Sequence, residues 1–151
     1  MEQSGSSPSS RTTRRIGYVI AIVFNVAFLV VVNNVVEWGW FSWVTADLND
    51  VLPIINVSLI ASIVANAAYL AFDPPWFKST AEFGLLIISL IVAVRLLQVF
   101  PFEFSTDGWE TLTRGLLIGV IAAIGLAMIV QLVRLARMAM SLDDPDRRSI
   151  P

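Results

Sequence analysis

Four long apolar segments dominate this sequence and restrict what it can fold into. The last of them, GLLIGVIAAIGLAMIVQLVRLAR over residues 115–137, carries no charge before its final turn. A helix needs about 20 predominantly apolar residues to cross a bilayer, and each segment approaches that length. The sequence therefore predicts an all-α protein, a compact up-down four-helix bundle within a membrane.

The apolar segments define the expected domain organisation. One transmembrane domain covers residues 16–140, with spans at about residues 16–36, 51–72, 83–100 and 112–136. Residues 1–15 bury too little apolar surface to order themselves and are predicted to be a disordered cytoplasmic tail, and residues 141–151 are predicted to be a polar cytoplasmic tail. The first span is longer than the apolar region of a signal peptide and is expected to remain as an uncleaved anchor.

Capping signals predict where the helices begin. Asp50 is expected to cap the second helix, where Pro53 is tolerated in the first turn. Ser79 followed by Glu82 matches a capping box, which predicts the start of the third helix. The fourth helix is expected to run from about residue 108 to residue 140, longer than a bilayer requires.

The distribution of basic residues predicts the orientation of the spans. Four spans place both chain ends on one side, and arginine and lysine favour the cytoplasmic side. Only Arg114 lies at the opposite boundary, and Arg95 lies within a span. The remaining basic residues fall on the side of the termini: Arg11, Arg14, Arg15, Lys78, Arg134, Arg137, Arg147 and Arg148. A multi-pass protein of the cell (plasma) membrane with cytoplasmic termini is therefore expected.

The absence of two residue types limits the catalytic and metal-binding chemistry open to this chain. The chain has no cysteine and no histidine, so thiolate chemistry and the commonest metal ligand and general base are absent. A formal net charge of −2 gives no basic excess for nucleic acid. We therefore expect a non-enzymatic protein without a metal or a cofactor, whose partners are the lipid bilayer and either copies of itself or another membrane protein.

Small residues recur at helical spacing on two of the spans. Gly115, Gly119, Ala123 and Ala127 follow one another at intervals of four, and the second span carries Ala61 and Ala65. Such faces allow close helix approach in lipid. Packing inside the bundle is the preferred interpretation and a dimer interface is the alternative. On the preferred interpretation, Gly119 tolerates leucine less well than Gly125, which lies outside the repeat.

Five polar side chains are expected at a similar depth near the outer side of the membrane, and they are the candidate ligand-binding residues: Arg95, Gln98, Asn33, Asn34 and Asn56. A charged residue inside a membrane usually indicates a functional site. The alternative is that an arginine close to a helix end extends its side chain to the interface, which is called snorkelling. Aromatic residues gather on the same side and would cover such a site: Trp38, Trp40, Phe41, Trp43, Phe100, Phe102, Phe104 and Trp109. The alternative function is therefore binding or transport of an amphipathic or anionic molecule of the outer leaflet.

Overall fold

The computed structural model describes residues 8–72 and 74–142 and is all-helical. The long helices are α1 (Pro8–Trp38), α2 (Leu52–Ala71), α3 (Pro75–Val99) and α4 (Asp107–Leu142), and a short 3-10 helix, η1 (Ala46–Asp50), precedes α2. All four long helices are long and apolar enough to cross a membrane. The helical fold class and the multi-pass membrane character expected from the sequence are therefore confirmed.

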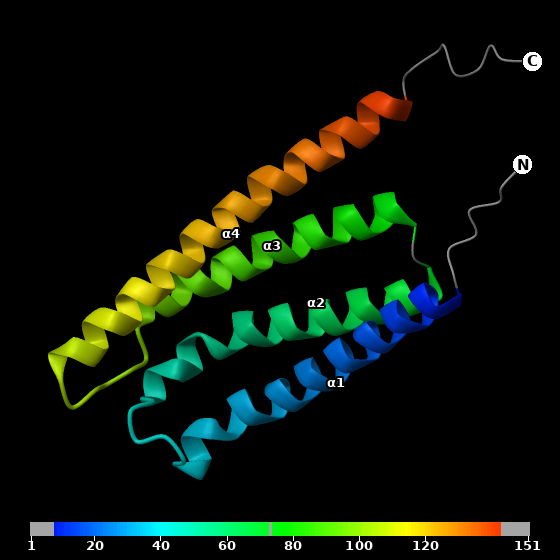
Figure 1. The fold of residues 1–151 in the computed structure, drawn as a ribbon. Coiled ribbons are helices and arrows are strands. Elements are labelled where there is room, and N and C mark those ends of the chain that lie inside the picture. Colours follow the sequence, from blue (N-terminus) through cyan, green and yellow to red (C-terminus); the bar gives the residue numbers. More distant parts are fainter. Residues whose placement is uncertain (1–7, 73, 143–151) are drawn as a thin grey trace, which may run out of the picture.

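The helices form an open layer in which each helix packs mainly on its neighbour in sequence. The extensive contacts join α1 to α2, α2 to α3 and α3 to α4, and α1 and α4 are not among the extensively packed pairs. Successive helices run in opposite directions (Figure 1). The compact bundle expected from the sequence is thus replaced by a layer with two free edges. Lipid is as apolar as the helix faces, so no hydrophobic force drives the edges together.

The layer has two ends that hold different parts of the chain (Figure 1). The loop end holds the connections between α1 and α2 and between α3 and α4. The terminal end holds the first turns of α1, the connection between α2 and α3, and the last turns of α4. A core at the loop end joins α1, η1 and α2 and is lined by Val32, Val35, Leu48, Val51, Ile55 and Leu59.

The start of α1 differs from the sequence expectation. Residues 8–15, predicted to be disordered, are helical and continue directly into the apolar segment. Extending an existing helix costs little compared with nucleating one, and a proline is well suited to the first helical position. Residues 141 and 142 of the second predicted tail continue α4, and the remaining tail residues, 1–7 and 143–151, lie outside the described residues.

Two predicted helix caps are wrong. The third helix begins at Pro75, so Ser79 and Glu82 lie inside it and form no capping box. Pro74 is extended and Pro75 occupies the first helical turn, where its fixed φ favours the helix and its missing N–H is not needed. At the second helix the N-cap is Val51, and no side chain caps the helix. There η1 leads straight into α2, which leaves Asp50 no capping role.

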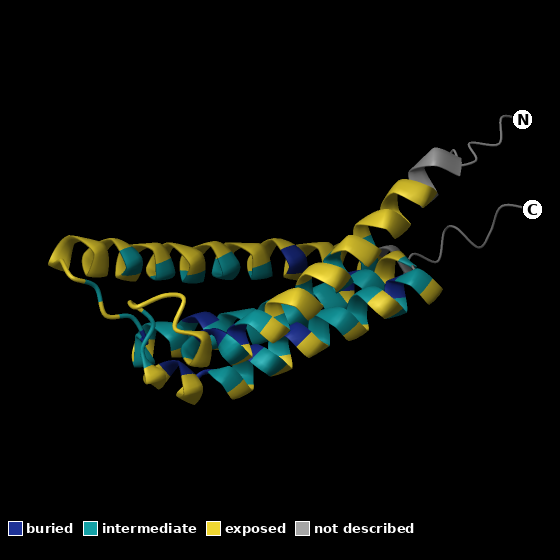
Figure 2. Cartoon of the chain, turned by 90° about the horizontal axis from the view of Figure 1, so that it is seen from below, coloured by how far each residue is buried: buried dark blue, intermediate teal, exposed yellow. Residues whose placement is uncertain are grey.

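The two glycines of the small-residue repeat of α4 do not pack inside the chain, whereas Ala123 and Ala127 line a hollow between α4 and α3. Gly115 and Gly119 are exposed, and a Cβ placed on either would meet no atom within 4 Å. Figure 2 shows a less exposed stripe along the otherwise largely exposed α4. The less exposed residues follow one another at alternating intervals of four and three positions, and they form the side of α4 that faces α3: Leu117, Ile121, Ile124, Met128, Gln131 and Leu135. The expectation of internal packing is therefore wrong for the two glycines. Ala61 and Ala65 of α2 are half-buried.

Candidate functional sites at the two ends of the layer

The structure brings together two of the five polar residues predicted to form a site. Asn33 of α1 and Asn56 of α2 exchange hydrogen bonds, with Nδ2 to Oδ1 distances of 2.7 and 2.9 Å. Asn34 instead donates to the Val30 carbonyl of its own helix. This reciprocal amide pair uses one donor and the carbonyl oxygen of each side chain, and it connects α1 to α2 close to the loop-end core.

The other two predicted site residues face outward from the layer. Arg95 and Gln98 of α3 are exposed, and neither makes a hydrogen bond or ion pair with another described residue. Arg95 lies one turn before the end of α3 at Val99, so its side chain can reach the polar region beyond the helix end. These two residues therefore do not converge on the Asn33–Asn56 pair.

The two connections at the loop end are joined by backbone hydrogen bonds. Glu103 N donates to the Trp43 carbonyl over 2.9 Å, and Thr45 N donates to the Pro101 carbonyl over 3.1 Å. These bonds flank an isolated antiparallel bridge between Val44 and Phe102. Segments nearly 60 residues apart in sequence are thereby held in a defined position over the ends of α2 and α3.

An aromatic groove of about 740 Å³ lies between these connections and the first turns of α4. Trp43, Phe102 and Phe104 line it together with Trp109, and Glu103 supplies a carboxylate. Of the loop-end aromatics expected to cover a site, Trp43, Phe102, Phe104 and Trp109 line this groove. None of the five predicted polar residues lines the groove, so the aromatics do not form a roof over Arg95.

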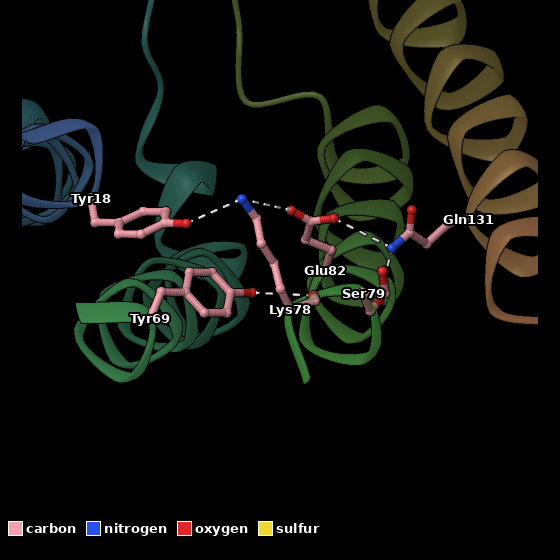
Figure 3. Close-up of polar contacts among 6 residues, drawn as sticks. All are labelled: Tyr18, Tyr69, Lys78, Ser79, Glu82 and Gln131. Atoms are coloured by element: carbon pink, nitrogen blue, oxygen red, sulfur yellow. Dashed lines mark hydrogen bonds and ion pairs between the residues drawn. The ribbon is translucent and has the colours of Figure 1, made fainter. Parts of the chain in front are cut away.

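A second polar cluster, at the terminal end, draws on all four helices (Figure 3). Gln131 of α4 is 6% exposed and donates to the Ser79 carbonyl over 2.9 Å and to Glu82 Oε2 over 3.3 Å. Lys78 pairs with the other oxygen of Glu82 at 3.9 Å and donates to the Tyr18 hydroxyl of α1 over 3.2 Å. A continuous chain of polar contacts therefore runs from α1 through α3 to α4.

Two tyrosines enclose the lysine of this cluster. The Lys78 ammonium lies 5.2 Å from the ring centre of Tyr18 and 5.9 Å from that of Tyr69, and the two rings are 5.4 Å apart. Both distances are within the range of cation–π attraction. The buried Tyr69 of α2 donates from its hydroxyl to the Lys78 carbonyl over 3.5 Å, so the cluster also connects α2 to the network. Its arrangement is that of a structural clamp, with the charge of Lys78 compensated by Glu82.

Sequence reasoning missed this cluster, although two signals were present. Gln131 is the polar residue that interrupts the apolar run before Arg134, and a lone amide in such a run usually finds a partner on a neighbouring helix. Lys78 and Glu82 are four residues apart, which places them on one face of a helix that begins before them. Interpretation of Glu82 as a capping residue concealed that pairing.

Comparison of the chain with protein-family models, with curated proteins and with solved structures finds no match.

Replacement of Gln131 by leucine is expected to loosen α4. The change removes the donor to Glu82 and to the Ser79 carbonyl, and interhelical hydrogen bonds in membranes contribute about 0.6 kcal/mol on average and at most about 1.7 kcal/mol. Thermal unfolding of the purified protein in detergent should show a lower Tm. Gln98→Leu is the matched control, because Gln98 is exposed without a partner among the described residues. Equal Tm values for both variants would show that the Gln131 contacts do not stabilise the packing.

Proposed function

We propose that the chain is a non-enzymatic integral membrane protein that acts through contacts made within the bilayer by the free faces of its edge helices. The observation that carries this proposal is the open layer, in which α1 packs extensively on α2 alone and α4 on α3 alone. Large apolar side chains on both edges are exposed, including Phe24 at 70% and Leu126 at 64%. An apolar surface of this extent needs lipid or another protein against it.

We further propose that the spans alternate in direction across the plasma membrane, with both termini in the cytoplasm. The described basic residues support this orientation. Arg14, Arg15, Lys78, Arg134 and Arg137 belong to the terminal end of the layer. At the loop end, Arg114 is held by Glu110, with Nε to Oε1 at 3.0 Å. Arginine and lysine close to span ends favour the cytoplasmic side, so the loop end would face outward.

Reporter fusions test this orientation. A fusion after Pro151 should be active only for a reporter that works in the cytoplasm, and one at Ser105 only for a reporter that works outside. The measurement is the activity of paired reporters at both positions in intact cells. A Pro151 fusion that is active only outside the cell would reverse the orientation.

Self-association through the exposed repeat of α4 is the contact that we propose to test first. Because Gly119 faces open space, Gly119→Leu should leave the Tm of the monomer in detergent unchanged while weakening association of fluorescently labelled chains in bilayers. Gly125 lies outside the repeat, and a Cβ placed on it also meets nothing within 4 Å, so Gly125→Leu is the matched control that should leave both the Tm and the association unchanged. Energy transfer between labelled chains at several protein-to-lipid ratios measures association. Wild-type chains that stay monomeric throughout would exclude this contact.

A second candidate function is binding of an amphipathic or anionic molecule of the outer leaflet at Arg95. The exposed guanidinium without a partner among the described residues favours it. If Arg95 holds an anionic group through its planar fork, Arg95→Lys should lose part of the co-purified lipid and Arg95→Gln nearly all of it. Native mass spectrometry of wild type and both variants measures those adducts. Identical adducts and identical Tm values would leave Arg95 with no role beyond snorkelling.

A further inference from the structure

We propose that the aromatic groove at the loop end binds a quaternary ammonium group, such as choline or a choline headgroup. Its volume, about 740 Å³, is in the range of small-molecule sites. Its walls combine aromatic rings with one carboxylate, and this combination favours a poorly hydrated organic cation over an anion or a neutral apolar molecule. The groove contains neither Arg95 nor the exposed glycines of α4, so it is a site distinct from those of the functions proposed above.

One wall of the groove is a cluster of three rings. Trp43 and Phe104 are stacked with ring centres 5.7 Å apart, and Phe102 lies 5.8 Å from Trp43 and 6.2 Å from Phe104. Trp109, at the start of α4, lines the same groove, is 60% exposed and makes no ring contact with another described residue. The Trp109 ring is therefore available to a ligand, while the wall of three rings is already assembled.

The charges around the groove select for a cation. Among the described residues that line it, Glu103 carries the only charge. The nearby Arg114 is occupied, because its guanidinium lies 3.8 Å from the ring centre of Phe100 and pairs with Glu110. No basic side chain of the groove lining therefore competes for the rings or neutralises Glu103. A methylated ammonium loses little hydration on entering between rings, whereas a primary ammonium would lose hydrogen bonds to water that rings replace poorly.

The groove is also held in shape before a ligand arrives. The hydrogen bonds from Glu103 N to the Trp43 carbonyl and from Thr45 N to the Pro101 carbonyl fix the two connections against each other. Pro101 is fully buried beneath them. Because the rings are positioned by backbone contacts, little ordering is required on binding, which favours affinity for even a small ligand.

Binding of free choline to the purified full chain in detergent is the primary test, and it does not depend on the function proposed above. Saturation-transfer NMR titrations should show tighter binding of choline than of its neutral isostere, in which carbon replaces nitrogen. Trp109→Leu, which keeps an apolar side chain but removes the ring, should weaken choline binding about three- to tenfold. Trp109→Phe should retain most of the affinity, and Glu103→Gln should weaken it without affecting the isostere.

Trp40→Leu is the matched control, because Trp40 is 64% exposed at the same end but does not line the groove. Choline affinity should be unchanged in that variant. Equal affinities for choline and its isostere, or equal effects of Trp109→Leu and Trp40→Leu, would overturn the proposal and leave the aromatics as an interfacial belt. Nanodiscs of phosphatidylcholine and of phosphatidylglycerol then distinguish the sources. If a choline-binding chain retains phosphatidylcholine selectively, the ligand is a lipid headgroup; if it does not, the ligand is a soluble amine.

Discussion

Each of the four long helices satisfies its backbone hydrogen bonds within itself, and this self-sufficiency allows the layer to remain open. In hydrocarbon an unpaired backbone group is costly, so helices are the form in which single segments cross a membrane. Once formed, such helices gain no hydrophobic stabilisation by closing into a bundle, because lipid tails solvate their apolar faces equally well. Their positions relative to one another are then set by local packing and by a few polar contacts.

Those polar contacts are concentrated at the two ends of the layer and differ in kind. At the loop end, backbone hydrogen bonds join the two connections, and the Asn33–Asn56 pair joins α1 to α2. At the terminal end, side chains do the joining: Lys78 reaches α1, and Gln131 reaches back from α4 to α3. Between the two ends, the residues through which the described helices face one another are mostly apolar.

The two ends also differ in what they offer to a ligand. The terminal cluster satisfies its own groups, because Glu82 neutralises Lys78 and accepts from Gln131, so it stabilises packing. The loop end leaves rings and a carboxylate exposed around a groove that its own backbone holds open. Binding is favoured where groups are positioned but not yet paired, which is the condition of Trp109 and Glu103 and not of Gln131.

The sequence alone determined the four helices, because span-length apolar runs bounded by proline and glycine have few other stable forms in a membrane. It also determined which residues lie at each end of the layer, because the fixed rise per residue of a helix relates the position of a residue in the chain to its depth in the membrane. Only the tertiary structure decided which face of each helix meets a neighbour. Gly119, predicted to lie inside, is exposed, and Gln131, a polar residue within an apolar run, is buried. The physical reason is that lipid-facing and protein-facing sides of a membrane helix are both apolar, so the hydrophobic pattern that separates inside from outside in a soluble protein is absent.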